Sequence, residues 1–186
     1  MKCDIFAFNY VLLLKGLSNE KKNRRKISLD AQEYESITTK YLDCIYRVAV
    51  NGCKNCADAE DVVQNTFVKL WQKDEPFEDE EHLRKWLIRV AVNECNSLWR
   101  SAWKRHTAYL EEMTHEPVFS TSERSNLYFA VQELPLKYRQ VVHLYYFEEY
   151  STKEIADIME LSDTAVQTRL LRARQKLKEI LKEAWQ

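Results

Sequence analysis

The chain has 186 residues, and its 28 lysines and arginines nearly balance 29 aspartates and glutamates, giving a formal net charge of −1. It contains only two glycines, which excludes phosphate-cradling loops, dinucleotide-binding fingerprints and nucleophile elbows, because each of these needs several glycines. Long stretches keep a helical period with few prolines to interrupt it, so we predict an all-α fold.

The first 29 residues combine an apolar run at 5–14 with a basic cluster at 21–26. The apolar run is too short to span a bilayer, and no small-x-small cleavage site of a signal peptide follows it. We interpret residues 1–29 as an extension of unknown role and expect no direct membrane insertion.

The five cysteines are odd in number and have no regular spacing, so reduced thiols in a cytoplasmic protein are the simplest interpretation. Cys53 and Cys56 form a single C-x-x-C pair. No second pair and no histidine pair stands near it, which favours a loop over a zinc or redox site.

Two amphipathic helices are predicted next. The first has an apolar stripe at helical spacing: Tyr34, Ile37, Tyr41, Ile45 and Val48. A break follows at 52–57, after which we expect Asp58 to cap the second helix and Asp61 to lie near its exposed N–H groups. The second helix directs a further apolar set toward the core: Val63, Phe67 and Leu70.

Residues 73–81 contain Pro76 and a dense acidic patch, which predicts a loop, and residues 82–104 predict a long helix with two faces. The inward face is apolar: Leu83, Leu87, Val90, Ala91 and Leu98. The outward face is a polar and basic stripe with Trp86 close to it: Arg89, Asn93, Asn96, Arg100 and Lys104. Basic residues with aromatic stacking surfaces suit single-stranded DNA. Core packing explains any single tryptophan of this helix (Trp86, Trp99 or Trp103) equally well.

Residues 106–126 lose the helical period at Pro117 and neighbouring serines, so we predict an acidic linker there. Further on, Ser151 and Glu154 form a capping box before a short apolar-faced helix, and Ser162 caps a longer basic helix that runs toward Leu181. Two helices joined by a tight turn, the second one longer and basic, are typical of a helix-turn-helix.

The longer basic helix has two distinct faces. Its buried stripe is apolar: Val166, Leu170, Ala173, Leu177 and Leu181. Near its start, the other face carries side chains that suit base edges in a major groove: Thr164, Gln167, Thr168, Leu171 and Arg172. Basic residues beside them suit phosphates: Arg169, Arg174 and Lys176. The alternative is a solvated basic helix in a bundle.

The C-terminal third resembles domain four of bacterial RNA polymerase sigma factors. The similarity is carried by Leu134-Pro135, Tyr138-Arg139, Glu154-Ile155-Ala156 and the run of nine residues at 166–174. The short chain points to the extracytoplasmic-function group. The family often has glycine where this chain has Glu160, so we expect a left-handed backbone at Glu160, at some energetic cost.

The middle of the chain resembles sigma region 2. Residues 58–71 are similar to the segment that binds the clamp helices of the polymerase β′ subunit, with Asp61 and Gln64 as the signature pair. The implied polymerase contacts are the outward residues of this helix: Asp61, Gln64, Asn65, Val68 and Lys69. Residues 83–93 are similar to the −10 recognition region, which implies −10 DNA contacts for Trp86 and the polar stripe. The family uses the 73–81 loop to hold a flipped base, but here the loop is unusually acidic.

The resemblance covers about residues 34–181 and implies two small helical domains joined by a flexible linker. These would be sigma region 2 at 30–105, the linker at 106–126 and sigma region 4 at 127–186. The implied function is to direct core RNA polymerase to promoters, opening the −10 DNA and reading the −35 duplex, with no catalytic residue and no cofactor. The implied partners are core RNA polymerase (through its β′ clamp helices and β subunit), promoter DNA and an anti-sigma factor.

Two other functions compete. A stand-alone helix-turn-helix regulator explains residues 151–181 but gives the Asp61–Gln64 helix no role. A metal-dependent helical enzyme would need Cys53, Cys56 and a histidine, and nothing in the sequence places His82, His106 or His115 beside the cysteines.

Overall fold

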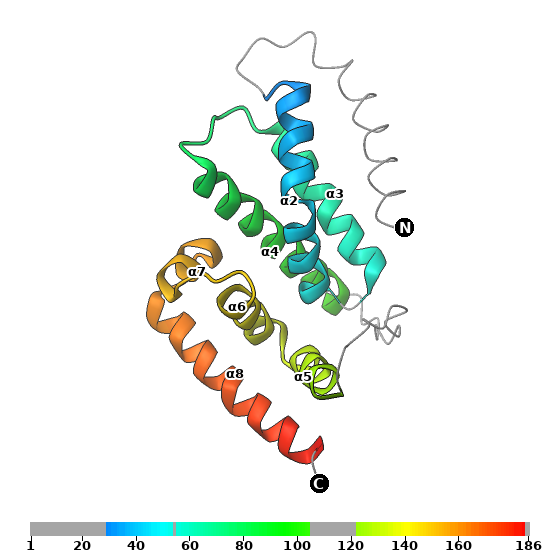
Figure 1. Cartoon of the computed structure of the whole chain (residues 1–186), viewed down its shortest axis with the longest axis vertical. Coiled ribbons are helices and arrows are strands. Elements are labelled where there is room, and N and C mark those ends of the chain that lie inside the picture. The colour runs from blue at the N-terminus through cyan, green and yellow to red at the C-terminus, as the bar shows by residue number, and fades with distance from the viewer. Residues whose placement is uncertain (1–28, 54, 105–121, 185–186) are drawn as a thin grey trace.

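The computed structural model describes residues 29–53, 55–104 and 122–184, and these residues form helices without any strand (Figure 1). In chain order the helices are α2 (Ala31–Gly52), α3 (Cys56–Gln72), α4 (Glu80–Lys104), α5 (Ser122–Glu133), α6 (Leu136–Tyr146), α7 (Thr152–Met159) and α8 (Asp163–Ala184). The all-α prediction is confirmed. The extension at 1–28 and residues 105–121 of the expected linker lie outside the described residues.

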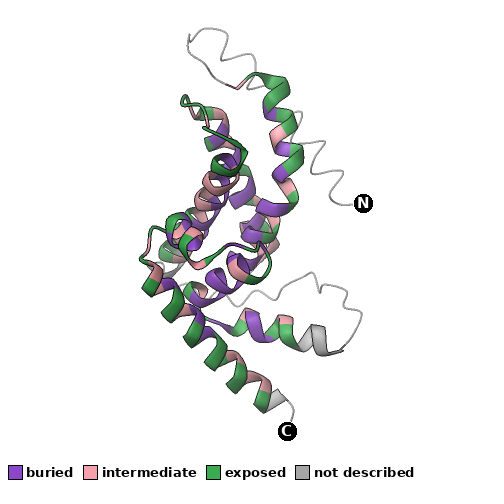
Figure 2. Ribbon diagram, turned by 60° about the vertical axis from the view of Figure 1, so that its left-hand side comes forward, coloured by how far each residue is buried: buried purple, intermediate pink, exposed green. Residues whose placement is uncertain are grey.

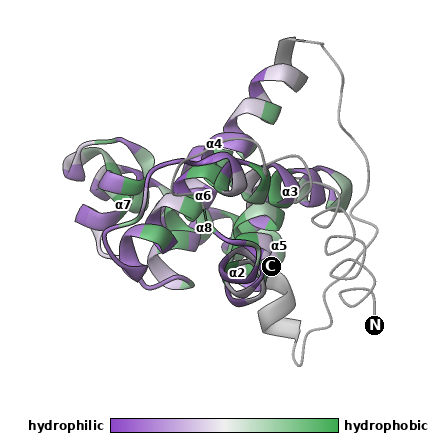
Figure 3. Cartoon of the chain, turned by 90° about the horizontal axis from the view of Figure 1, so that it is seen from above, coloured by the Kyte–Doolittle hydropathy of each residue, from purple (hydrophilic) through white to green (hydrophobic). Residues whose placement is uncertain are grey.

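Helices α2, α3 and α4 pack against one another around an apolar core. The predicted stripes supply this core, because Ile45, Val63, Phe67 and Leu87 are fully buried. Burying each such side chain contributes roughly 1.5–3 kcal/mol. Asp30 begins α2 with a complete capping box, in which Glu33 donates its backbone N–H to the Asp30 side chain and accepts the Asp30 N–H in return. Hydrophobic and hydrophilic residues alternate along the helices, as amphipathic packing requires (Figure 3).

The prediction for the start of α3 was wrong by three residues. Asn55, and not Asp58, is the N-cap, and its side chain accepts the Asp58 backbone N–H at 2.7 Å. Asn55 has the same capping chemistry as an aspartate, and its side-chain amide also donates a hydrogen bond to the Asp58 carboxylate at 3.0 Å. Asp61 therefore lies beyond the first turn, where its carboxylate is not needed to satisfy the helix start.

Helix α4 begins at Glu80, two residues before the predicted start, because Asp79 accepts the His82 backbone N–H at 2.7 Å in an N-cap geometry. The acidic loop is correspondingly shorter. Helix α5 begins at Ser122, inside the segment predicted as linker.

The C-terminal helices confirm the helix-turn-helix. Ser151 and Glu154 form the expected capping box at the start of α7. Ser162 caps α8, since its hydroxyl accepts the Ala165 N–H at 3.2 Å. Between them Glu160 has φ 55°, the expected left-handed conformation. Side chains from α6, α7 and α8 close this part of the core: Val141, Leu144, Ile155, Ile158, Val166 and Leu170.

The two groups of helices pack against each other. Helix α6 lies on α2 and α7 lies on α4 (Figure 1). In Figure 2, buried residues gather where the helices meet, whereas the helix that ends near the C-terminus is exposed along much of its length. Of the helices described, none is long and apolar enough to cross a membrane.

Candidate nucleic-acid interface

The first half of α8 presents an exposed polar face. Residues that the sequence predicted to meet base edges are all exposed: Thr164, Gln167, Thr168, Leu171 and Arg172. Leu171 is 55% exposed although it is apolar, which leaves its methyl groups available to a partner. Behind this face Val166, Leu170 and Ala173 are buried, as predicted. The remaining two members of the predicted buried stripe, Leu177 and Leu181, are only half-buried, so the prediction holds for the first half of α8.

Contacts within the C-terminal helices orient the exposed face of α8. Gln167 donates to the Asp163 carboxylate at 2.9 Å, one turn earlier in the same helix. Arg174 donates to the Tyr146 hydroxyl at 2.9 Å, and a hydrogen bond from Arg172 lowers the pKa of Tyr138. Tyr146 and Tyr138 of α6 thus orient the Arg174 and Arg172 side chains of α8, so α6 and α8 are held together. Arg169 is half-buried and Lys176 is exposed, so both remain candidates for phosphate contact.

The polar stripe of α4 is divided between solvent and protein. Asn93 and Arg100 are exposed, whereas Arg89 and Asn96 touch the C-terminal helices. Arg89 donates through Nη2 to the Asp157 carbonyl of α7 at 2.8 Å, and Asn96 accepts from the Gln140 amide of α6 at 3.2 Å. Lys104 ends the helix, and its side chain lies outside the described part of the chain. Arg89 and Asn96, two of the five residues expected to face DNA, are therefore engaged by contacts with the chain itself.

Trp86 has a packing role beside the acidic loop. Its ring meets Phe77 edge to face at 5.5 Å between centroids, and the Lys73 ammonium lies 5.9 Å from its centre. Trp99 donates its indole N–H to the Gly52 carbonyl at 3.0 Å, which holds α4 to the end of α2. Gly52 is required there, because a Cβ would lie 2.3 Å from Cys95 Sγ. Trp99 thus serves the fold, while half-buried Trp86 keeps part of its surface accessible.

The outward face of α3 carries the residues expected to bind polymerase. Asp61, Gln64 and Asn65 are exposed, and no hydrogen bond involves the Asp61 or Gln64 side chain among the described contacts. Val68 is half-buried, and Lys69 forms an ion pair with Glu94 of α4. Asp61 and Gln64 can therefore form hydrogen bonds with a partner protein, and the partly exposed Val68 beside them can form an apolar contact.

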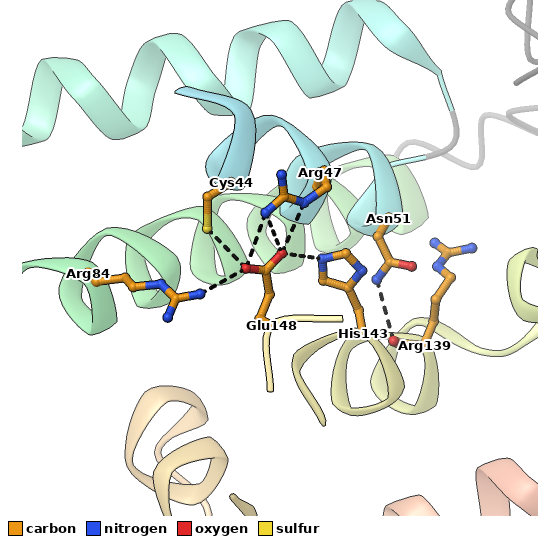
Figure 4. Close-up of polar contacts among 7 residues, drawn as sticks. All are labelled: Cys44, Arg47, Asn51, Arg84, Arg139, His143 and Glu148. Carbon is orange, nitrogen blue, oxygen red and sulfur yellow. Dashed lines mark hydrogen bonds and ion pairs between the residues drawn. The ribbon is translucent and has the colours of Figure 1, made fainter. Parts of the chain in front are cut away.

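Sequence reasoning missed a buried carboxylate between the two helical domains. Glu148 lies in the turn between α6 and α7, and its side chain is only 1% exposed (Figure 4). Arg47 of α2 donates to Glu148 Oε1 at 3.1 Å, Arg84 of α4 donates to Oε2 at 3.1 Å, and the Cys44 thiol donates to Oε2 at 3.3 Å. His143 Nε2 lies 3.4 Å from Oε1. We call Cys44, Arg47, Arg84, His143 and Glu148 the Glu148 cluster.

The electrostatics of the Glu148 cluster favour the ionised carboxylate. Burial alone would raise the pKa of Glu148, but the neighbouring His143, the hydrogen bond from Cys44 and the charge of Arg47 lower this pKa to about 2. Burial, together with the neighbouring Glu148 charge, raises the pKa of the Cys44 thiol to about 11, so this thiol stays protonated and can donate. Because Arg47, Arg84 and Cys44 lie more than 60 residues from Glu148, no local motif announces the cluster.

Other polar contacts cross the same boundary. Lys85 of α4 lies 3.0 Å from the Glu154 carboxylate, whose hydrogen bonds to Ser151 and Lys85 lower its pKa to about 2. Arg139 of α6 is 1% exposed and donates to the Gly52 carbonyl at 3.3 Å. The Asn51 amide donates to the Arg139 carbonyl at 3.4 Å (Figure 4). The boundary between the two groups of helices is thus rich in ion pairs and hydrogen bonds.

The cysteines form no metal site in the described part of the chain, where no three His, Cys, Asp or Glu side chains gather as a metal would need. Cys53 is buried with its sulfur 3.9 Å from that of Cys95, while Cys56 starts α3. The C-x-x-C spacing therefore places the two cysteines in different surroundings.

Comparisons with known proteins agree with this geometry. Residues 37–105 match the family model described as Sigma-70 region 2, and residues 124–177 match the one described as Sigma-70, region 4. The ECF RNA polymerase sigma factor SigM of Bacillus subtilis is 28% identical over 151 residues, covering 77% of this chain and 92% of that protein. The ECF RNA polymerase sigma factor SigL of Mycobacterium tuberculosis is 30% identical over 147 residues, covering 75% and 83%.

Two solved structures share the fold. The sigma factor RpoE from Bartonella quintana, in complex with the anti-sigma factor NepR, superposes with a TM-score of 0.70 at 24% identity, covering 81% of this chain and 98% of that one. The structure of CnrH in complex with the cytosolic domain of CnrY gives a TM-score of 0.61 at 22% identity, covering 92% and 96%.

Proposed function

Because the chain belongs to the sigma-70 family of RNA polymerase sigma factors, in the extracytoplasmic-function group, we propose that it directs core RNA polymerase to promoters through three separate surfaces. These surfaces are the outward face of α3 for polymerase, the stripe of α4 for −10 DNA and the exposed face of α8 for −35 DNA. The single observation that carries the proposal is their occurrence, in this order, on one chain. Members of this family are not enzymes, and we propose no catalytic residue and no cofactor.

We propose that α8 reads the −35 duplex in the major groove. Arg172 can donate two hydrogen bonds to a guanine and Gln167 can pair with an adenine, while Leu171 can contact a thymine methyl group. Arg169, Arg174 and Lys176 would hold phosphates and so fix the orientation of α8 without reading sequence. The exposure of all five base-facing side chains supports this assignment.

The α4 stripe is proposed to capture unstacked −10 DNA. Asn93 and Arg100 are exposed, and Trp86 offers part of an aromatic surface for stacking, which is worth about 1–3 kcal/mol per base. Arg89, Asn96 and Lys104 would complete the stripe. Binding of bases that have left the duplex is the means by which a protein without catalytic groups can open DNA.

Polymerase binding is assigned to Asp61, Gln64, Asn65, Val68 and Lys69 on α3, against the β′ clamp helices. We propose a polymerase- and −10-binding domain at 30–105. The −35-binding domain then begins at Ser122, where α5 starts, and not at the predicted residue 127. We further propose an anti-sigma factor and the polymerase β subunit as partners, as for other members of the family. We place the protein in the cytoplasm because polymerase and promoter DNA are its proposed partners.

The stand-alone regulator remains the alternative function. It would use only α7 and α8, and it would leave the exposed Asp61–Gln64 face and the match of residues 37–105 to region 2 without a role. Among the described residues, the Cys53 sulfur lies against that of Cys95 and no metal-binding cluster forms, while His106 and His115 lie outside them.

The proposal is tested by mixing the purified protein with core RNA polymerase and separating the complex on a sizing column under reducing conditions. We expect the wild-type chain to co-elute with polymerase. The double change Asp61→Ala and Gln64→Ala should weaken binding by at least about 30-fold, as truncation of interface hot spots does. The matched control is Gln32→Ala with Asp43→Ala, which removes the same two residue types from exposed positions on α2.

Two outcomes would contradict the proposal. Full binding by the Asp61/Gln64 variant would show that the clamp assignment is wrong. Failure of the wild-type chain to bind polymerase at all would favour the stand-alone regulator. DNA binding by α8 should be equal in wild type and variant, because Asp61 and Gln64 lie on the other domain.

A further inference from the structure

The C-terminal helices occupy part of the surface that α4 would offer to DNA. Arg89 and Asn96 belong to the stripe assigned to −10 DNA, yet their polar groups are bound to Asp157 and Gln140 of the C-terminal domain. Asn93 and Arg100, on the same stripe, remain exposed. One surface therefore has two competing occupants, and DNA cannot contact the whole stripe until α6 and α7 move away.

We propose that the C-terminal domain is an intramolecular cover of the −10-binding stripe and that Glu148 is the latch that holds this cover closed. The inference rests on the proposed function, which assigns the stripe to DNA. It adds a closed state of the free chain and names the residue on which that state depends.

The latch role of Glu148 follows from where its partners lie. Arg47, Arg84 and Cys44 all belong to the N-terminal domain, and only His143 comes from the same domain as Glu148 (Figure 4). A carboxylate that is 1% exposed is stable only while such partners replace its lost water. The Glu148 cluster is therefore complete in the closed state and is dismantled when the domains part.

The turn that carries Glu148 is built to hold it in place. The Glu148 N–H donates to the His143 carbonyl at 3.2 Å, and the Tyr150 N–H donates to the Leu144 carbonyl at 3.0 Å. Between them Glu149 has φ 61°, a left-handed conformation that a non-glycine residue adopts only when its surroundings impose it. Arg84 also lies over the Tyr150 ring, 5.0 Å from its centre, so one arginine contacts two residues of this turn.

The polar character of the cover suits a contact that must open. Arg89 is a cation held only by a neutral carbonyl, and a DNA phosphate offers it a stronger, charged partner. Arg47 is 52% exposed on its side chain, so it can return to water at little cost when the latch releases. Binding of polymerase and DNA to the open state would then shift the population toward it.

Zero-length cross-linking tests the closed state directly. A carbodiimide activates a carboxylate, and a neighbouring lysine amine then attacks it, forming an amide and releasing the corresponding urea. Lys85 lies 3.0 Å from Glu154 across the boundary and 3.5 Å from Glu81 within α4. The Lys69–Glu94 pair joins α3 and α4 within the N-terminal domain. In mass spectra of the monomeric fraction, the Lys85–Glu154 product reports closure, the Lys85–Glu81 product reports the reactivity of Lys85, and the Lys69–Glu94 product reports folding of the N-terminal domain.

Two variants are designed to open the latch. Glu148→Lys places a cation against Arg47 and Arg84. Arg47→Glu places an anion against Glu148, at a position that is already partly exposed to solvent. Glu149→Gln, at the exposed neighbour, is the matched control. We expect both latch variants to lose at least about tenfold of the Lys85–Glu154 product relative to the Lys69–Glu94 product, as a shift of the closed–open equilibrium requires. The control should match wild type.

The proposal is overturned if wild type forms no Lys85–Glu154 product, or if either latch variant that keeps the Lys69–Glu94 product also keeps the wild-type ratio. Should Glu148→Lys fail to fold and lose both products, Arg47→Glu decides. Polymerase is absent from this experiment, so its outcome is separate from that of the Asp61/Gln64 test. Both latch variants should still bind polymerase.

Discussion

Helices α4 and α8 both carry side chains proposed to contact DNA, but they stand in different states. The reading face of α8 is exposed, and its contacts are local: Gln167 bonds to Asp163, and Thr168 bonds to the Thr164 carbonyl. The stripe of α4 is bound at Arg89 and Asn96 by residues more than 40 positions away in the chain. The face of α8 proposed to read −35 DNA is thus exposed, while two residues of the α4 stripe proposed to bind −10 DNA are engaged by the C-terminal helices.

The difference reflects what each helix is proposed to bind. A duplex exists before the protein arrives, and a preformed helix can enter its major groove without rearrangement. Unstacked −10 bases exist only while the duplex is being opened, and a permanently exposed basic and aromatic stripe would bind other nucleic acids. Covering that stripe with the domain proposed to read −35 DNA would couple the availability of one surface to the position of the other.

The largest expected effect is a loss of folding stability at low pH, because protonation of Glu148 weakens the contact that holds the C-terminal helices over the α4 stripe. The pKa of Glu148 is about 2 in the folded chain, below its ordinary value of 4.5. The stability that Glu148 supplies is therefore complete above pH 4.5 and is lost as the pH falls toward 2, up to about 3 kcal/mol in total.

The measurement is the free energy of unfolding by urea at several pH values, for wild type and for Glu148→Gln. Wild type should lose more stability than the variant between pH 4.5 and 2. Parallel curves for the two proteins would show that the Glu148 cluster does not hold the ionised carboxylate specially.

An effect of intermediate size is expected on DNA binding by the exposed face of α8. Replacing Arg172 by alanine should relax specificity at one −35 base pair by about 1–3 kcal/mol, because a bidentate contact to a base edge is lost. Replacing Lys176 by alanine should instead weaken binding equally on all promoter variants, as expected for a phosphate contact.

Both changes are measured by binding to a set of −35 duplexes, each with one base pair altered. The Arg172 result should be the same in the Glu148→Lys background, because α8 is exposed whether the cover is open or closed. An equal loss across all duplexes for Arg172→Ala would rule out base reading by this residue.

The smallest effect separates two neighbours on α4. Asn96→Ala should lower the free energy of unfolding by about 1 kcal/mol, because it leaves the buried Gln140 amide without its partner. Asn93→Ala should change stability by less than about 0.5 kcal/mol, because Asn93 is exposed. Both should weaken capture of −10 DNA in the polymerase complex. Equal stabilities for the two variants would mean that the covered half of the stripe carries no interdomain contact.

Local chemistry made much of the fold predictable from sequence. The apolar stripe of α3, the capping box at Ser151 and the left-handed Glu160 depend on residues within a few turns of one another, and all are confirmed. The stripes of α2 and α8 are confirmed except at Ile37, Leu177 and Leu181, which are half-buried. The error at the start of α3 arose between two polar residues of similar capping strength, Asn55 and Asp58, where only the fold decides which one lies outside the helix.

Contacts between distant segments were not predictable in the same way. Nothing in the sequence around Glu148 indicates that its carboxylate is buried, because its partners lie on α2, α4 and α6. The polar stripe of α4 was recognised by its spacing, but spacing cannot reveal that another domain of the same chain lies on it. The exposed faces of α3 and α8 are present as expected, and their polymerase and DNA contacts remain predictions.

The most direct test of the covered stripe is the rate at which phenylglyoxal, an arginine-specific reagent, modifies Arg89 and Arg100 in the free chain. Both arginines lie on the α4 stripe, but Arg89 is held by the Asp157 carbonyl and Arg100 is exposed. We expect Arg100 to react at least about tenfold faster, and the difference to shrink in Glu148→Lys, because in the closed state the reagent must compete with the bond of Arg89 to the Asp157 carbonyl. Equal rates for the two arginines in the wild-type chain would contradict the closed state.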